Sequence, residues 1–315
     1  MRFRVYPMEA TMNRKSFLEQ KRIGVLMRVF AQKEDDIPNR IELVRNLLSR
    51  LDIAGVIDGK MRIDSVDVLV WADQRFLNSK TKPDCGKTAQ ALREAFPSQI
   101  KVREVRNGDL FCGVLNYGVA FQTRNRVDYS LILSPEAFPY INRETFTTVI
   151  DAAANGALAI GVAIDELRES ILEGRIANTF ALWHNISLMT VGGFDCRAEL
   201  PEDDRFAYYF RGWEGEPTNT VLSGVEEVRP LARMVQTFGS CIAPIVPQGE
   251  INGGYQIPDP QKQPELFERH VRKMRSKTER QSALLADIGF NLSYLKGGVT
   301  SEYQHPLVFG SSNEK

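Results

Sequence analysis

Apolar residues in the first half of the chain follow two alternating patterns. Short, nearly continuous apolar runs lie at 22–30, 66–72, 100–105, 127–134 and 157–163. Runs of this length, rich in β-forming residues and bounded by polar segments, predict buried strands, although the last run also fits a buried turn. The segments between the runs repeat apolar residues at helical spacing. The clearest example comprises Ile41, Val44, Leu47, Leu48 and Leu51.

Strands that alternate with helices at this spacing predict an α/β fold with a parallel sheet covered on both faces. Pro38 begins the first predicted helix, and Asn142 caps a later one that ends near Ala154. In sheets of this kind ligands bind beyond the carboxyl ends of the strands. The residues that directly follow each predicted strand are therefore the first candidates for a functional site.

The composition narrows the class of protein. Among 315 residues, 40 basic and 40 acidic side chains balance, so we expect no nucleic-acid partner. The four cysteines form no CxxC pair and fit no zinc module. The N-terminus has no apolar signal segment, and no stretch approaches the roughly 18 apolar residues of a membrane helix. We therefore expect a cytoplasmic protein with reduced thiols.

Changes in composition along the chain predict three parts. Residues 1–21 indicate an N-terminal arm, 22–247 the main domain, and 248–315 a Gly- and Pro-rich linker followed by a basic helix and a tail. The basic helix, over 265–280, fits peripheral contact with anionic lipid. It equally fits packing on the main domain, or on a partner subunit of a homo-oligomer.

Two common phosphate-binding motifs are incomplete in the sequence. Gly86-Lys87-Thr88 matches the end of a Walker A loop, but the required earlier glycine is replaced by Thr81. No GxGxxG turn follows the first predicted strand. We therefore expect neither a P-loop nucleotidase nor a dinucleotide-binding Rossmann domain.

A further group of residues points to a specific family. Gly192-Gly193-Phe194-Asp195 follows a hydrophobic segment and precedes Glu202-Asp203, and then an amphipathic helix that ends at Arg211. Asn116-Tyr117-Gly118 lies on an earlier predicted helix. Together with the order of strands and helices, these segments resemble family 2 glycosyltransferases over residues 22–245. The resemblance implies a GT-A-like, mostly parallel sheet flanked by helices, with a C-terminal helical extension.

The resemblance also implies transfer of a sugar from a UDP- or GDP-linked donor to an acceptor glycan or small molecule. It assigns the general base to Asp203, beside Glu202. Glycosyl transfer needs such a carboxylate within hydrogen-bond reach of the attacking hydroxyl. Glu202, Asp203 and Asp204 crowd three carboxylates together, and like-charge repulsion favours proton uptake by such a group. The alternative is an acidic cap at the start of a helix.

The donor site is expected at the carboxyl ends of several strands. The resemblance implies nucleotide contacts by Arg28 and Phe30, which close the first predicted strand, and by Asp73, which follows the second. Asp73 also fits an ordinary turn residue.

The segment after the fourth strand departs from the family pattern. The family carries an Asp-x-Asp motif that binds a divalent cation, whereas this chain has Ser134-Pro135-Glu136. Glu136 alone remains as a ligand for Mg²⁺ or Mn²⁺, with His305 as a second candidate. Otherwise basic side chains neutralise the donor diphosphate. The candidates for this role are Arg124, Arg126, Lys80 and Lys82.

His184, Asp195 and Trp213 are candidates for the acceptor site, because the resemblance assigns their region to the acceptor. His184 also fits a histidine with internal partners beside Trp183, and Trp213 also fits a core residue. Acidic residues exceed basic ones over 151–261, which favours a neutral or cationic acceptor. Two other classes of function stay open. Ser134-Pro135-Glu136 suits a nucleotide-sugar-binding protein without transferase activity, and the basic helix suits an interaction or assembly protein.

Overall fold

The computed structural model describes residues 12–31, 34–57, 60–71, 85–105, 110–162, 176, 178–195, 226–249, 259–265, 267–268, 271, 281–282 and 284–300.

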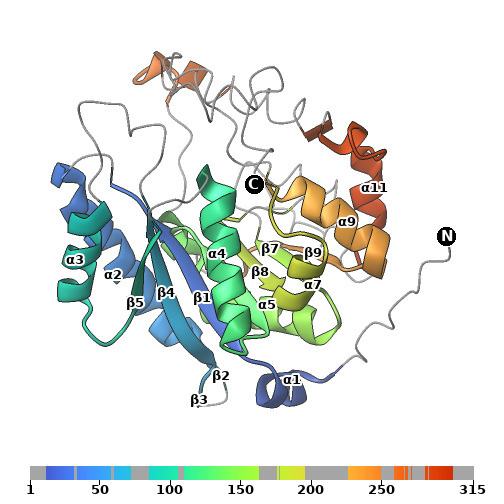
Figure 1. The fold of residues 1–315 in the computed structure, drawn as a ribbon, viewed down its shortest axis with the longest axis horizontal. Coiled ribbons are helices and arrows are strands. Elements are labelled where there is room, and N and C mark those ends of the chain that lie inside the picture. The colour runs from blue at the N-terminus through green and yellow to red at the C-terminus, as the bar shows by residue number, and fades with distance from the viewer. Residues whose placement is uncertain are drawn as a thin grey trace, which may run out of the picture.

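A seven-stranded sheet forms the centre of the fold (Figure 1). Its spatial order is β5 (Lys101–Val105), β4 (Ile63–Trp71), β1 (Ile23–Val29), β6 (Tyr129–Leu133), β8 (Phe180–His184), β7 (Ala159–Val162) and β9 (Ile242–Ile245). All neighbouring strands are parallel except β8, which runs antiparallel to both β6 and β7. A short hairpin of β2 (Val56–Ile57) and β3 (Lys60–Met61) lies outside this sheet.

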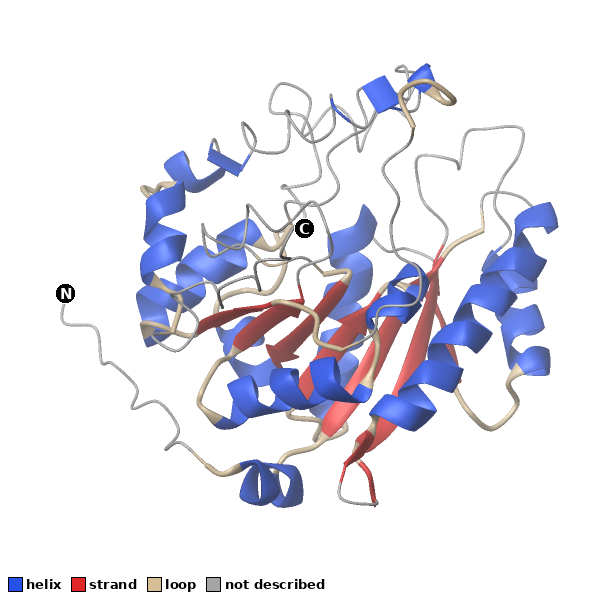
Figure 2. Cartoon of the chain, turned by 180° about the vertical axis from the view of Figure 1, so that it is seen from behind, coloured by secondary structure: helices blue, strands red, loops and turns tan. Residues whose placement is uncertain are grey.

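Helices cover both faces of the sheet, which Figures 1 and 2 show from opposite sides. Buried residues of α1 (Arg14–Gln20), α2 (Ile37–Ala54), α3 (Cys85–Ala95) and α5 (Arg143–Ala154) share one core with one face. Residues of α4 (Leu110–Arg124), α7 (Asn185–Thr190), α9 (Val228–Phe238) and α11 (Leu292–Gly297) share the core on the other face. Two 3-10 helices, η1 (Glu34–Asp36) and η3 (Pro135–Tyr140), precede α2 and α5.

The predicted α/β fold class, a mostly parallel sheet flanked by helices, is confirmed. All five apolar runs form strands, and Asn142 caps α5 through its side chain, which accepts a hydrogen bond from the Thr145 amide at 2.8 Å. Sequence analysis did not resolve β8, α7, α9 and β9 as separate elements. The predicted N-terminal arm contains α1, whose Phe17 and Leu18 are buried in the core.

A buried polar network fixes α4 on the sheet. Asp67 on β4 is 2% exposed, and its carboxylate accepts hydrogen bonds from Arg103 on β5 at 2.8 Å and from the Gln122 amide on α4 at 3.1 Å. The same amide nitrogen donates to the Val25 carbonyl of β1 at 3.0 Å, while Ser130 of β6 donates to the amide oxygen at 2.6 Å. Since buried polar groups need partners, this network specifies the position of α4 over four strands.

The C-terminal residues 284–300 pack on the same core as α9. Leu285 and Leu295 are fully buried there. The Cys241 amide donates to the Gly298 carbonyl at 2.9 Å, and Thr300 donates to the Ile242 carbonyl at 3.0 Å, so this segment lies beside β9. Most of the predicted basic helix over 265–280 lies outside the described residues. Among the described helices, none has the length and hydropathy needed to cross a membrane.

Gly118 allows α4 to approach the sheet closely, so Gly118→Ala is expected to destabilise the fold. A Cβ atom at this position would lie 2.6 Å from Cδ1 of Leu26 and 2.8 Å from Cδ1 of Leu69. Overpacking of this kind lowers the free energy of unfolding by about 1–3 kcal/mol, which outweighs the roughly 1 kcal/mol gained in helix propensity. Chemical denaturation measures the change. The control is Gly297→Ala in α11, where no heavy atom lies within 4 Å, and an equal loss in both variants would contradict the packing argument.

Burial of the Cys241 thiol makes stability depend on pH in the alkaline range. Burial raises the pKa of Cys241 to about 12. The unfolded thiol ionises from about pH 8.5, so the stabilisation is complete below that pH and is lost as the pH rises toward the folded pKa. Between pH 9 and 11 the free energy of unfolding is expected to fall more steeply in the wild type than in Cys241→Ala, by up to about 1.4 kcal/mol per pH unit. Identical slopes in denaturation at stepped pH would refute this linkage.

Candidate functional site

The strand order reverses between β1 and β6. From β1 the chain continues to β4 and β5 on one side, and from β6 it continues to β7 and β8 on the other. In open α/β sheets, ligands bind beyond the carboxyl ends of the strands at such a reversal. The two carboxyl ends lie side by side, because Met27 of β1 pairs with Leu133 of β6. The segments that follow them, η1 with α2 and then η3, therefore surround the expected site.

A cation and a carboxylate join these two segments. Nη1 of Arg40, at the start of α2, donates to Oε1 of Glu136 on η3 at 2.7 Å. Oε2 of Glu136 accepts a hydrogen bond from the hydroxyl of Ser134. Nε of Arg40 is buried and has no hydrogen-bond partner among the described residues. The side chains stay accessible, with 28% of Arg40 and 52% of Glu136 exposed, so a ligand can reach the pair.

This arrangement does not fit the divalent cation that the resemblance implies. Both carboxylate oxygens of Glu136 already accept hydrogen bonds, one of them from a guanidinium. A neighbouring positive charge also repels a second cation. Within the ranges that the structure describes, no group of three or more His, Cys, Asp or Glu side chains could hold a metal ion. The expected metal ligand is thus part of an ion pair.

Arg28 and Phe30 lie at the carboxyl end of β1, on the face of the sheet opposite to α2 and η3. Side chains alternate along a strand, so both residues share the face of Leu26, which belongs to the core under α4. Phe30 is partly buried against that core, and Arg28 is also partly buried. Their position agrees with the predicted donor contacts, which stay a prediction.

The structure places Arg124 and Arg126 at the opposite edge of the sheet. They flank Asn125, whose carbonyl accepts a hydrogen bond from Nη1 of Arg22 at 2.9 Å, and Arg22 directly precedes β1. Because α4 runs antiparallel to the strands it covers, its last residues lie at their amino ends. Arg124, at the end of α4, and Arg126, in the turn after it, therefore lie at the edge opposite to the carboxyl ends, whereas Arg28 and Arg40 lie at the carboxyl ends.

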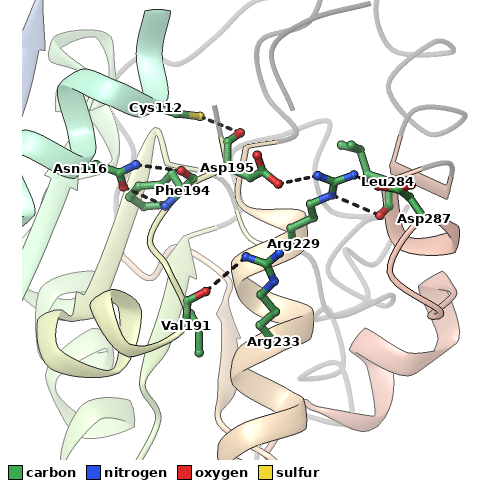
Figure 3. Close-up of polar contacts among 9 residues, drawn as sticks. All are labelled: Cys112, Asn116, Val191, Phe194, Asp195, Arg229, Arg233, Leu284 and Asp287. Carbon is green, nitrogen blue, oxygen red and sulfur yellow. Dashed lines mark hydrogen bonds and ion pairs between the residues drawn. The ribbon is translucent and has the colours of Figure 1, made fainter. Parts of the chain in front are cut away.

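The Gly-Gly-Phe-Asp segment forms a turn that α4 holds in place (Figure 3). Nδ2 of Asn116 donates to the Phe194 carbonyl at 2.8 Å, and the Phe194 amide donates to Oδ1 of Asn116 at 2.8 Å. Gly192 and Gly193 have φ angles of 96° and 71°, which favour glycine. A Cβ atom at Gly193 would also lie 2.5 Å from Oδ1 of Asn116. Two segments that resemble the same family separately are thus hydrogen-bonded to each other.

Asp195 ends this turn in a buried ion pair. Its carboxylate accepts a hydrogen bond from Nη1 of Arg229 on α9, and the Arg229 side chain is fully buried (Figure 3). Nη2 of Arg229 also donates to Asp287 in the C-terminal segment. Only 8% of the Asp195 side chain is exposed. The carboxylate therefore anchors the turn to α9, and direct contact with an acceptor would require this pair to open.

His184 lies away from the carboxyl ends. It is the last residue of β8 and pairs with Tyr129, the first residue of β6, at the amino edge of the sheet. Its Nδ1 lies 2.7 Å from the Ser187 hydroxyl, and its ring lies 4.9 Å from the Tyr129 ring. The residue is 8% exposed. This position agrees with a histidine that has internal partners and separates it from the Arg40–Glu136 pair.

Several predicted site residues lie outside the described residues. They are Asp73, Lys80, Lys82, Glu202, Asp203, Trp213 and His305. Sequence reasoning in turn missed Arg40 and Arg229. Arg40 could have been found, because it lies in the first turn of the helix that follows the first predicted strand. Arg229 carries no comparable signal, since its role depends on a contact with Asp195, 34 residues away in sequence.

No protein-family model matches the sequence, and no curated protein matches it, so membership of family 2 stays a prediction. Among solved structures, the chain is similar to a mannosyltransferase from Pyrobaculum calidifontis in complex with GDP-Man and Mn²⁺, with 13% identity and a TM-score of 0.40 over 91% of this chain and 78% of that chain. It is also similar to glucosyl-3-phosphoglycerate synthase from Mycobacterium tuberculosis in complex with Mn²⁺, UDP-glucose and phosphoglyceric acid. That similarity has 11% identity and a TM-score of 0.43 over 88% of this chain and 85% of that chain. Similarity at this level gives no information on the chemistry of the site, which depends on the residues of this chain.

Arg229→Met is expected to lower the free energy of unfolding by about 3–5 kcal/mol, because it removes the guanidinium that pairs with the buried Asp195 carboxylate. Arg233→Met removes a 3.3 Å hydrogen bond to the Val191 carbonyl and is expected to cost about 1 kcal/mol. Urea denaturation compares the two. Adding Asp195→Asn to Arg229→Met is expected to recover part of the loss, since the buried negative charge is then gone. The absence of any recovery would count against the ion pair.

Proposed function

We propose that the protein transfers a sugar from a nucleotide-sugar donor, linked to UDP or GDP, to an acceptor hydroxyl. The observation that carries this proposal is the pair of hydrogen bonds between Asn116 and Phe194. They join two of the segments on which the resemblance to family 2 glycosyltransferases rests, and these segments lie 78 residues apart in sequence. The site where the strand order reverses supports the donor end of the proposal, with Arg28 and Phe30 as donor contacts.

The reaction assigns a role to each proposed residue. The acceptor oxygen attacks the anomeric carbon of the donor sugar while the bond from that carbon to the diphosphate oxygen breaks. The hydroxyl proton passes to the carboxylate of Asp203, with Glu202 beside it, and the nucleoside diphosphate leaves. Asp73 is proposed to contact the nucleoside and Trp213 the acceptor. Donors of this chemical class, GDP-Man and UDP-glucose, are bound in the two solved structures named above.

A second candidate is a protein that binds a nucleotide sugar without transferring it. The ion pair between Glu136 and Arg40 favours this candidate, because the family's metal-binding carboxylate is engaged in another contact. The two candidates share the donor site and differ in turnover, so one assay separates them.

Asp203→Asn is expected to lower turnover by at least about 100-fold, because it removes the proposed base while leaving the donor contacts in place. The assay follows release of UDP or GDP from UDP-glucose and GDP-mannose, with a panel of mono- and disaccharide acceptors. The control is the neighbouring Asp204→Asn, expected to keep turnover within roughly threefold since Asp204 has no assigned role.

The assay has three informative results. Unchanged turnover in Asp203→Asn would remove Asp203 as the base. Donor binding without turnover on any acceptor would favour the binding protein. If calorimetry detects no binding of UDP, GDP or either sugar at millimolar concentration, both candidates are wrong.

A further inference from the structure

We infer that the donor diphosphate binds beside Arg40 without a divalent cation, and that Glu136 is the counter-ion of this arginine rather than a metal ligand. The inference rests on the proposed function, since it names the cation that holds the diphosphate of that donor. Glu136 is the predicted metal ligand, but in the structure both of its carboxylate oxygens accept hydrogen bonds, one from Arg40 and one from Ser134.

The position of the ion pair suits a phosphate. Arg40 and Glu136 bridge the segments after β1 and β6, where the strand order reverses. The start of α2 also lies there, and the positive end of a helix dipole favours an anion. Arg40 is 28% exposed, so its guanidinium is accessible to a ligand. An arginine presents several donors in one plane, which matches the oxygens of a phosphate.

The charges around Arg40 are compensated only in part. Oε2 of Glu34, on η1, is 2.8 Å from Nζ of Lys87 on α3, so an ion pair offsets this carboxylate. Asp35 and Asp36 lie directly before α2, so their carboxylates compete with a ligand anion for the positive end of the helix dipole. Glu136 carries a single negative charge against the guanidinium. A nucleoside diphosphate brings a larger negative charge and competes with Glu136 for the same donors.

The contacts of Glu136 define its role in ligand binding. Its two oxygens are held by Arg40 and by the Ser134 hydroxyl. A carboxylate held in this way neutralises the guanidinium until a ligand displaces it. Glu136 is therefore the internal counter-ion of Arg40, and removing its charge has the opposite consequence from removing a metal ligand. The loss of a metal ligand weakens binding, whereas the loss of Glu136 frees the arginine.

Calorimetric titration of the full chain with UDP and with GDP tests the inference, with EDTA and separately with Mn²⁺. The wild type is expected to bind with affinities that differ by less than about threefold between the two conditions. Arg40→Gln is expected to weaken binding by at least about 10-fold in EDTA, since it removes charge-assisted hydrogen bonds. Arg40→Lys keeps the charge but loses the planar geometry, so an intermediate affinity is expected.

Glu136→Gln separates a metal ligand from a counter-ion of Arg40. We expect this variant to bind at least as tightly as the wild type in EDTA, because the guanidinium loses its internal competitor. The matched control is Arg45→Gln on the same helix. Arg45 pairs with Glu42 on the same surface of α2, and its loss is expected to leave nucleotide affinity unchanged. Thermal melts of all variants establish that each is folded.

Three results would overturn the inference. The first is nucleotide binding that requires Mn²⁺ and is lost in Glu136→Gln. The second is an affinity of Arg40→Gln equal to that of Arg45→Gln. In both of these cases the nucleotide still binds and the proposed function stands. The third result, no binding of either nucleotide in any condition, would remove the proposed function as well.

Discussion

The two hydrogen bonds between the Asn116 amide and the Phe194 backbone fix the turn at residues 192–195 against α4. Their effect depends on α4 itself being fixed, which the buried network of Asp67, Gln122 and Ser130 achieves across four strands. The turn therefore takes its position from the sheet through a chain of polar contacts, each of which is short and directional. Glycine at position 193 is the condition that allows this close approach, because any Cβ would collide with the amide.

Arg229 connects the turn at residues 192–195 to the C-terminal segment at 284–300. One buried guanidinium pairs with Asp195 in the turn and with Asp287 in the C-terminal segment. A buried charge without compensation is strongly unfavourable, so the Arg229 guanidinium favours the arrangement in which the turn, α9 and the C-terminal segment meet. Residues 284–300 are accordingly part of the same core as α9, and the site is framed by segments that are far apart in sequence.

At the carboxyl ends of β1 and β6, charge decides whether a metal ion or an arginine can hold a diphosphate. The family to which the sequence bears a resemblance uses carboxylates and a metal ion after the fourth strand, and this chain places an arginine against the one remaining carboxylate. An arginine side chain is itself positively charged. A metal ion would bring its charge only if several deprotonated side chains were present to bind it. Arg40 places a cation at the edge where the resemblance predicts a metal ion, so Ser134-Pro135-Glu136 is compatible with diphosphate binding.

The fold class, the strands β1, β4, β5, β6 and β7 and the helices between them could be predicted from the amino-acid pattern, because the two apolar periods are local properties of the chain. The short hairpin of β2 and β3 and the strands β8 and β9 could not, since their apolar runs are too short to stand out. Which residues meet was decided only in three dimensions. Arg124, Arg126 and His184 lie at the edge opposite to the carboxyl ends of the parallel strands, since a helix or an antiparallel strand reverses direction. Arg40 and Glu136, separated by 96 positions, are brought together because β1 and β6 are neighbours in the sheet, and strand order is a property of the folded chain.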